Sequence, residues 1–145
     1  MSSAASEAPR LVYLDSSAIV KLVVTEVESA ALGAYLRGAE LVSSEIADVE
    51  VPRAAYLRTG RSESVSRAEV VLRRLSLVPL DDELRRAAAR ARPAELRTLD
   101  AIHLISCLRL AGQLDSVVCY DRRLGAALLA ASLPVEAPGP QARRG

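Results

Sequence analysis

The feature that most constrains this chain is a pair of short apolar runs that each end at an aspartate. Arg10–Leu14 (RLVYL) has the character of a β-strand and is followed at once by Asp15, and Ser116–Tyr120 (SVVCY) is followed at once by Asp121. Because strands that alternate with helical patterns favour an α/β fold, we predict a mostly parallel central sheet. Open sheets of this kind place their functional sites beyond the carboxyl ends of the strands, where both aspartates are expected to lie.

The other elements are predicted from apolar periodicity and from cap and breaker residues. Ser16 or Ser17 is expected to cap the first helix and Thr98 a later one, whereas Gly60 and Gly112 are expected to end helices. The predicted helices cover Ala18–Val24, Val27–Arg37, Glu45–Arg58, Val65–Leu75, Asp81–Ala91, Leu99–Ala111 and a segment from Asp121 to about Ala131. The further predicted strands are Glu40–Ser43, Leu133–Val135 and, unless it only leads into the next helix, Leu77–Leu80.

The length of 145 residues and a hydrophobic fraction of 50% suit one domain with an ordinary core. We expect this domain to span residues 10–137, with flexible tails at 1–9 and 138–145. No apolar run approaches the ~18 residues of a membrane span, and the N-terminus lacks the pattern of a signal peptide. Cys107 and Cys119 lack metal-site spacing, so we expect reduced core thiols in a cytoplasmic protein.

Charge is distributed unevenly along the chain. The formal net charge is −5 over residues 1–52, +5 over 53–97 and +1 over 98–145, and 18 of the 19 basic residues are arginine. The basic segment suits an RNA backbone, a solvated helical face or a face that docks a protein partner. With no Phe or Trp and four Tyr, RNA binding would depend on salt-sensitive phosphate contacts rather than on base stacking.

Two further acids, Glu50 and Asp100, stand on apolar stretches of predicted helices. Their neighbours at helical spacing are Ile46, Ala47, Ala54 and Leu57 for Glu50, and Leu96, Leu104, Cys107 and Ala111 for Asp100. Burying an ionised carboxylate alone costs several kcal/mol, so each acid needs a cation, hydrogen-bond donors or a proton. Taken singly, each acid also has a structural interpretation as a helix cap or as the partner of an arginine such as Arg53.

One cause accounts for all four acids. If Asp15, Glu50, Asp100 and Asp121 meet in one crevice, they repel one another unless a hard divalent cation neutralises them. Carboxylate oxygens with water are the ligands that Mg²⁺ or Mn²⁺ prefers, and a set without histidine or thiolate ligands points away from zinc. Such ions assist phosphoryl chemistry by activating water and by stabilising charge on the attacked phosphate.

Four segments of the chain, in order, resemble the PIN-domain family, and specifically the VapC-type toxin ribonucleases of type II toxin–antitoxin systems. These segments are VYLDSSAIVKL with Asp15 and Ser17, SSEIADVEVPRA with Glu50, TLDAIHLISCLRL with Asp100, and VVCYDRRLGAALLAASLPV with Asp121. The resemblance extends over residues 11–135. It is interrupted at Pro52, two residues after Glu50, where the family continues a regular helix, so a kink or a late helix start is expected there.

The resemblance implies a three-layer α/β/α fold and a Mg²⁺- or Mn²⁺-dependent endoribonuclease that cleaves RNA through a metal-activated water. It also implies a cognate VapB-type antitoxin that blocks the site, and a homodimer or a toxin–antitoxin hetero-oligomer. By this resemblance Asp15 and Asp100 are the principal metal ligands, and Glu50 and Asp121 complete the catalytic and metal-binding pocket. Ser17 would hydrogen-bond to a carboxylate or to water, and its alternative role is a helix cap.

Three basic residues near these acids also need an interpretation. His103, one helical turn after Asp100, is interpreted as a packing or hydrogen-bonding residue rather than as an acid–base group. Arg122 and Arg123 follow Asp121 directly and are candidate RNA-phosphate contacts, with a solvated helix start as the alternative.

Other functions fit the residues less well. A phosphatase of the haloacid-dehalogenase type needs a second aspartate two residues after the first, where this chain has Ser17. A phospho-receiver domain needs a lysine late in the sheet, and the only lysine is Lys21. A catalytically silent PIN-fold binding module that acts through its antitoxin stays open as the alternative, although the presence of all four acids favours catalysis.

Overall fold

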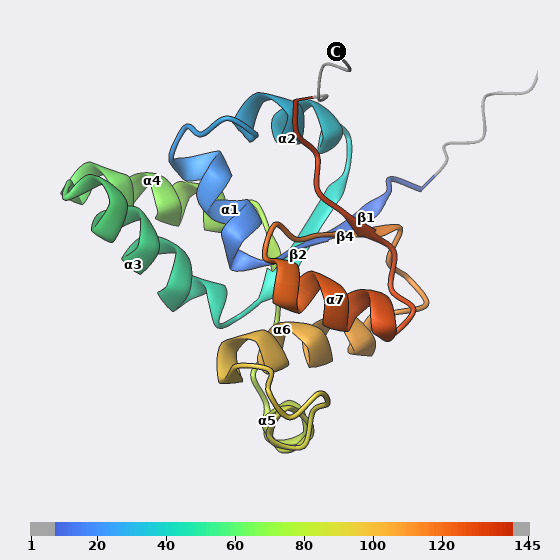
Figure 1. Ribbon diagram of the computed structural model, residues 1–145. Helices are drawn as coiled ribbons and strands as arrows, with labels where there is room; N and C mark the ends of the chain where they lie inside the picture. Colours follow the sequence, from blue (N-terminus) through green and yellow to red (C-terminus); the bar gives the residue numbers. More distant parts are fainter. Residues whose placement is uncertain (1–7, 141–145) are drawn as a thin grey trace, which may run out of the picture.

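The structure is a computed structural model that describes residues 8–140 (Figure 1). Its strands are β1 Leu11–Leu14, β2 Glu40–Ser44, β3 Ser76–Val78, β4 Ser116–Val118 and β5 Val135–Glu136. Its helices are α1 Ser16–Val23, α2 Ser29–Tyr35, α3 Ala47–Thr59, α4 Ser62–Leu72, α5 Asp82–Ala89, α6 Thr98–Arg109 and α7 Arg122–Ala130. Most of each expected tail, residues 1–7 and 141–145, lies outside the described residues.

The strands form one sheet in the order β3-β2-β1-β4-β5, and every pairing is parallel. The central strand β1 is buried on both faces, since Val12, Tyr13 and Leu14 are each 0% exposed. A parallel strand with both faces covered reads as a continuous apolar run, which is why RLVYL was recognisable as a strand. The predicted α/β class and parallel sheet are confirmed.

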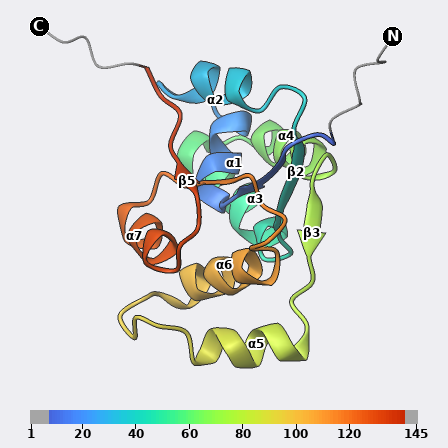
Figure 2. The same ribbon diagram turned by 90° about the vertical axis from the view of Figure 1, so that its right-hand side faces the viewer.

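Helices cover both faces of the sheet, as a three-layer α/β/α fold requires (Figures 1 and 2). Because side chains alternate along a strand, Val12 and Leu14 of β1 pack with α1, α2, α3 and α4 in one core. Tyr13, between them, points to the opposite face and packs in a second core with α5, α6 and α7. Helix α5 runs along the outside of α6 (Figure 2).

The connections create a crevice between the neighbouring strands β1 and β4. From β1 the chain crosses through α1 and α2 to β2 on one side, whereas from β4 it crosses through α7 to β5 on the other side. Such a reversal of direction opens a gap at the carboxyl ends of the two strands, which is where open α/β sheets place their sites. Asp15 follows β1 directly, and Asp121 comes three residues after β4.

The helix caps differ from those predicted. Asp15, not Ser16 or Ser17, caps α1, which therefore begins at Ser16. Thr98 is the first residue of α6, and its neighbour Arg97 stands at the cap position without a side-chain cap bond. Asp15 directly precedes the first residue of α1, so its carboxylate accepts the free backbone N–H of Ala18 and serves as the cap in place of a serine.

The last strand also begins later than predicted. Leu133 is buried and its N–H donates to the carbonyl of Leu128, so it belongs to the turn that ends α7. Ser132 has a φ of 63°, the left-handed conformation that turns the chain there. The strand β5 consequently begins at Val135 rather than at Leu133.

The state of the two cysteines and the length of the helices were both predicted from the sequence. Cys107 and Cys119 are buried free thiols, as predicted. Within residues 8–140 no helix is long and apolar enough to cross a lipid bilayer.

Replacing Leu128 by alanine tests the second core. Leu128 is 0% exposed on α7, so Leu128→Ala should lower the free energy of unfolding by about 2–5 kcal/mol through lost burial and a residual cavity. The adjacent Leu129 on the same helix is 62% exposed, and Leu129→Ala should change this energy by no more than about 0.5 kcal/mol. Urea denaturation followed by circular dichroism measures both, and equal losses would contradict the described packing.

Candidate active site

Asp15 is the most buried of the four expected site acids, with 3% of its surface exposed. Its Oδ1 accepts a hydrogen bond from the backbone N–H of Ala18 at 2.9 Å, which is the cap of α1. The Ser17 hydroxyl donates to the same carboxylate, at 2.7 Å from Oδ1 and 2.9 Å from Oδ2. The expected hydrogen bond between Ser17 and a carboxylate is therefore present.

The Asp15 carboxylate has donors but no cation in direct contact. Burial raises the pKa of Asp15 above its ordinary value, and the His103 charge together with the donors Ser17, Ala18 and Cys119 only partly opposes this effect. In the described part of the chain, no lysine or arginine forms an ion pair with Asp15. Ionised Asp15 is therefore incompletely compensated by the protein.

Glu50 is held by two donors from different elements. Its Oε1 accepts from the Ser16 hydroxyl at 2.7 Å and lies 2.8 Å from His103 Nε2. Burial raises the pKa of Glu50, but His103 and Ser16 outweigh burial and leave this pKa below its ordinary value. Both bonds use Oε1, and among residues 8–140 no hydrogen bond to Oε2 is formed. Oε2 is thus available to a water or a cation.

His103 is a buried link between the sheet and Glu50. It is 2% exposed, and its Nδ1 lies 2.7 Å from the hydroxyl of Tyr13. Burial raises the pKa of Tyr13, so the phenol keeps its proton and can donate it to Nδ1. When the imidazole accepts this proton at Nδ1, its own proton is on Nε2 and is donated to Glu50. His103 is a hydrogen-bonding residue, as interpreted from the sequence.

The pKa of Asp100 depends on the other three acids. Burial raises the pKa of Asp100, and the charges of Asp121, Glu50 and Asp15 raise it further, while His103 opposes them. Because charge–charge effects fade with distance, these contributions indicate that Asp100 lies within electrostatic range of Asp121, Glu50 and Asp15. Asp100 itself lies in the first turn of α6 and is half-buried.

Asp121 occupies the exposed side of this cluster. Its Oδ1 accepts from the backbone N–H groups of Arg123 at 2.8 Å and Leu124 at 3.0 Å, so it caps α7. Cys119 joins it to Asp15, since Sγ lies 3.3 Å from both Asp15 Oδ2 and the Asp121 carbonyl oxygen. Burial, and after it the Asp15 charge, raises the pKa of the Cys119 thiol well above its ordinary value. Cys119 therefore remains a neutral donor.

The four acids fit a hard divalent cation by their chemistry. They supply carboxylate oxygens, and among residues 8–140 the only basic side chain that contacts any of the four directly is His103. In the described part of the chain, no three His, Cys, Asp or Glu side chains already stand together as a metal cage. Mg²⁺ needs no such cage, because it commonly keeps several waters and takes one or two carboxylates plus substrate phosphates.

The surroundings of Glu50 differ from the prediction. We expected a buried apolar stripe that included Leu57, but Leu57 is 68% exposed, and the buried face of α3 is formed by Ala47, Val51 and Ala55. Glu50 lies at the margin of that face, with 20% of its side chain exposed. The helix begins two residues later than predicted and continues through Pro52 to Thr59. Pro52, in the second turn, leaves the Asp48 carbonyl without its usual donor.

Three contributors to the site were not singled out from the sequence. Ser16 was considered only as a cap, Tyr13 only as part of a strand and Cys119 only as a core thiol. A signal existed for Ser16, which follows a strand-end acid directly. Tyr13 and Cys119 carry no local signal, because their contacts depend on how the strands pair. Arg122 and Arg123 lie exposed at the start of α7, beside Asp121.

The chain is similar to known proteins along most of its length. The family model of the PIN domain matches residues 12–127. "Ribonuclease VapC46" of Mycobacterium tuberculosis is 43% identical over 129 residues, which cover 88% of this chain and 97% of that protein. "Ribonuclease VapC35" of the same species is 42% identical over 139 residues, which cover 92% of this chain and all of that protein.

Solved structures support the fold. The crystal structure of M. tuberculosis VapC20, described as a toxin that cleaves the sarcin–ricin loop, is similar with a TM-score of 0.65 and 15% identity over 80% of this chain and 94% of its own. Rickettsia felis VapBC2, solved with a DNA fragment from its promoter, is similar with a TM-score of 0.66 and 12% identity over 88% of this chain and 98% of its own. At these identities the likeness concerns the fold alone.

The raised pKa of Asp100 predicts how stability depends on pH. The folded state holds this proton more tightly than the unfolded state, so its contribution is lost as pH rises from the ordinary value of 3.8 through the higher folded pKa. Asp100→Asn should therefore raise the melting temperature in EDTA near neutral pH, and this gain should vanish at pH about 3. The exposed acid Asp48, in the first turn of α3, provides the control, because Asp48→Asn removes a favourable helix-dipole interaction and should give no gain. Calorimetry across this pH range checks both, and an equal gain from Asp48→Asn would contradict the acid cluster.

The link through His103 predicts a spectroscopic change. Tyr13→Phe removes the donor to Nδ1, so the ¹⁵N spectrum of the only histidine in the chain should lose the signature of a single Nε2–H tautomer. Stability should fall by about 1–3 kcal/mol, because a buried acceptor is left unpaired. The control Tyr35→Phe removes a hydroxyl bonded to Ser116 and should leave the imidazole spectrum unchanged. An unchanged spectrum in Tyr13→Phe would show that the phenol does not select the tautomer.

Proposed function

Because the chain belongs to the PIN-domain family and, within it, to the VapC-type ribonucleases, we propose that it is a Mg²⁺- or Mn²⁺-dependent endoribonuclease toxin controlled by a cognate VapB-type antitoxin. The observation that carries the metal dependence is the Asp15 carboxylate, which is 3% exposed at the end of β1 and is contacted within residues 8–140 only by neutral donors. The raised pKa of Asp100, caused by burial and by Asp121, Glu50 and Asp15, supports it. Acids that disfavour one another's ionisation in the free protein are stabilised as anions by a bound divalent cation.

The roles of the site acids follow from their surroundings. Asp15 and Asp100 are proposed as the principal metal ligands, because burial raises the pKa of both and neither forms an ion pair with a lysine or arginine in residues 8–140. Glu50, whose Oε2 is available, and the more exposed Asp121 complete the pocket or hold water beside it. When bound, the divalent ion supplies a lowered pKa for the attacking water and charge stabilisation on the phosphate.

The protein's own residues orient this chemistry. Ser17 and Ala18 hold the Asp15 carboxylate in one rotamer. His103 and Ser16 do the same for Glu50, which keeps it ionised and able to accept a proton from water. Arg122 and Arg123, at the mouth of the crevice, are proposed phosphate contacts.

Partners and location belong to the same proposal. The solved relative VapBC2 is named as a VapB–VapC pair bound to promoter DNA, which supports an antitoxin that covers this site and assembly as a homodimer or hetero-oligomer. We propose the cytoplasm as the place of action, where RNA and antitoxin are found together.

Cleavage of purified RNA tests the activity. Wild-type protein should cleave RNA in Mg²⁺ and not in EDTA, and Asp15→Asn and Asp100→Asn should each lower kcat about 10²-fold or more, because each removes a ligand charge. The control Asp48→Asn removes an exposed carboxylate from α3 and should leave kcat unchanged. Undiminished cleavage by both site variants would overturn the assignment. RNA that stays uncleaved by the wild type would favour the silent binding module.

A further inference from the structure

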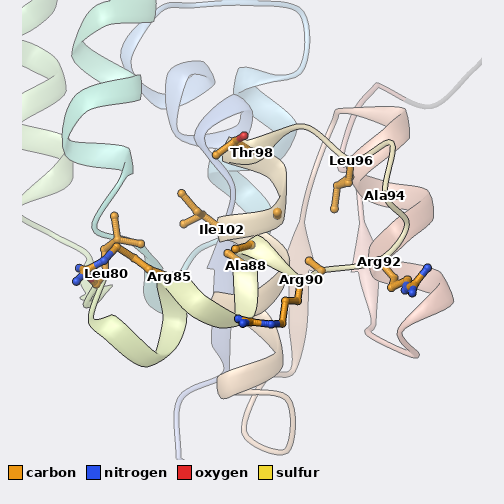
Figure 3. A pocket seen from close by; sticks show the side chains of 12 residues that line it. Leu80, Arg85, Ala88, Arg90, Arg92, Ala94, Leu96, Thr98 and Ile102 are labelled. Atoms are coloured by element: carbon orange, nitrogen blue, oxygen red, sulfur yellow. The ribbon is translucent and has the colours of Figure 1, made fainter.

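A cleft lies apart from the acid cluster, between α5, the loop at 90–97 and the first turns of α6 (Figure 3). Its volume is about 800 Å³. Ala88, Leu96 and Ile102 give it an apolar floor, because they belong to or pack against the second core. A cleft of this size with an apolar floor accommodates a planar organic group rather than a lone ion.

Arginines line this cleft, and no acidic residue does so among the residues described. Arg85 lies at one end and Arg92 at the other, with Arg90 between them (Figure 3). Arg85 donates hydrogen bonds to the Leu80 carbonyl and to Asp82, and Arg90 donates one N–H to the Arg86 carbonyl. Arg92 makes no hydrogen bond within residues 8–140. Arg90 and Arg92 therefore retain donors for an anion.

The cleft and the acid cluster share helix α6 but use different faces of it. Thr98, Ala101 and Ile102 are spaced three and four residues apart and line the cleft. Asp100 and His103, also three apart, lie on the face directed toward Glu50 and β1. A ligand that reaches both places must pass over the N-terminus of α6, a distance of about one helix diameter or 10 Å. An extended polymer meets this condition.

We propose that this cleft is a subsite for a nucleotide of the RNA strand that flanks the scissile bond. The base occupies the apolar floor, where a guanidinium can stack on it, and the adjoining phosphates bind Arg90 and Arg92. The inference rests on the proposed ribonuclease function for the identity of its ligand. The apolar floor favours a nucleotide base over the carboxylate of an acidic peptide, because apolar side chains offer a carboxylate no hydrogen-bond donor.

Binding of RNA without cleavage tests the cleft. A fluorescent single-stranded RNA of about twelve nucleotides is titrated in EDTA with the full chain and with the double variant Arg90→Gln/Arg92→Gln, whose exposed sites tolerate substitution. We expect the dissociation constant to rise about tenfold or more. The slope of log affinity against log salt should fall by about 1.4, or 0.7 for each lost phosphate contact.

The matched control removes the same charge elsewhere in the basic segment. Arg67→Gln/Arg74→Gln takes two exposed arginines from α4 and its C-terminal end, and it should change neither the affinity nor the salt slope. Equal weakening by both double variants would show that only net charge matters and would overturn the subsite.

A second measurement does not depend on substitutions. RNA that carries 4-thiouridine should crosslink to peptides within residues 85–102, and crosslinks confined to other regions would overturn the proposal.

Loss of binding to a polyglutamate peptide in Arg90→Gln/Arg92→Gln, with RNA affinity kept, would assign the cleft to a protein partner and also overturn it. RNA cleavage by the wild type in Mg²⁺ distinguishes the subsite from the nuclease proposal. If the wild type cleaves RNA but RNA affinity does not depend on Arg90 and Arg92, the subsite alone is refuted. Binding that depends on these arginines, without cleavage, refutes the nuclease alone.

Discussion

The site depends on the cost of holding a carboxylate at the buried end of the central strand. Asp15 is 3% exposed and receives donors from Ser17, Ala18 and Cys119, yet burial still raises its pKa. Glu50 meets a similar cost with His103 and Ser16, and its pKa falls. Asp100 accepts no hydrogen bond from a side chain within residues 8–140, and burial together with the charges of Asp121, Glu50 and Asp15 raises its pKa. The crevice thus gathers more negative charge than its own donors offset, and a divalent cation is the group that would complete the balance.

The parallel sheet is what brings these charges together. Because β1 and β4 are neighbours whose following helices cover opposite faces, Asp15 and Asp121 come from segments 106 positions apart and still share one edge. Each also caps a helix. The structural and functional interpretations of these aspartates are therefore compatible. An aspartate that caps a helix is held in one orientation, and this restraint lowers the entropy lost when it binds a ligand.

Periodicity was sufficient to predict the order and type of the elements, because each strand is a short apolar run and each helix has a buried face. Boundaries were wrong where backbone bonds compete, as at Leu133, which the end of α7 retains. The strand-end position of Asp15 and Asp121 also indicated the site's edge. The hydrogen bonds of His103 could not be predicted in the same way. Tyr13 and Glu50 lie 90 and 53 residues away from it, and only the packed sheet brings their side chains to opposite sides of one ring.

Helix α6 connects the two parts of the molecule on which RNA cleavage would depend. One face presents Asp100 and His103 to the acid cluster, and another forms a wall of the arginine-lined cleft with Thr98 and Ile102. Both faces are anchored in the second core by Leu104 and Cys107. Since a single rigid helix carries both, a strand bound in the cleft would be held at a nearly constant distance from the acids. The fold therefore offers a fixed spacing between the α6 wall of the cleft and the acids, while Arg90 and Arg92 reach the strand from the segment between α5 and α6.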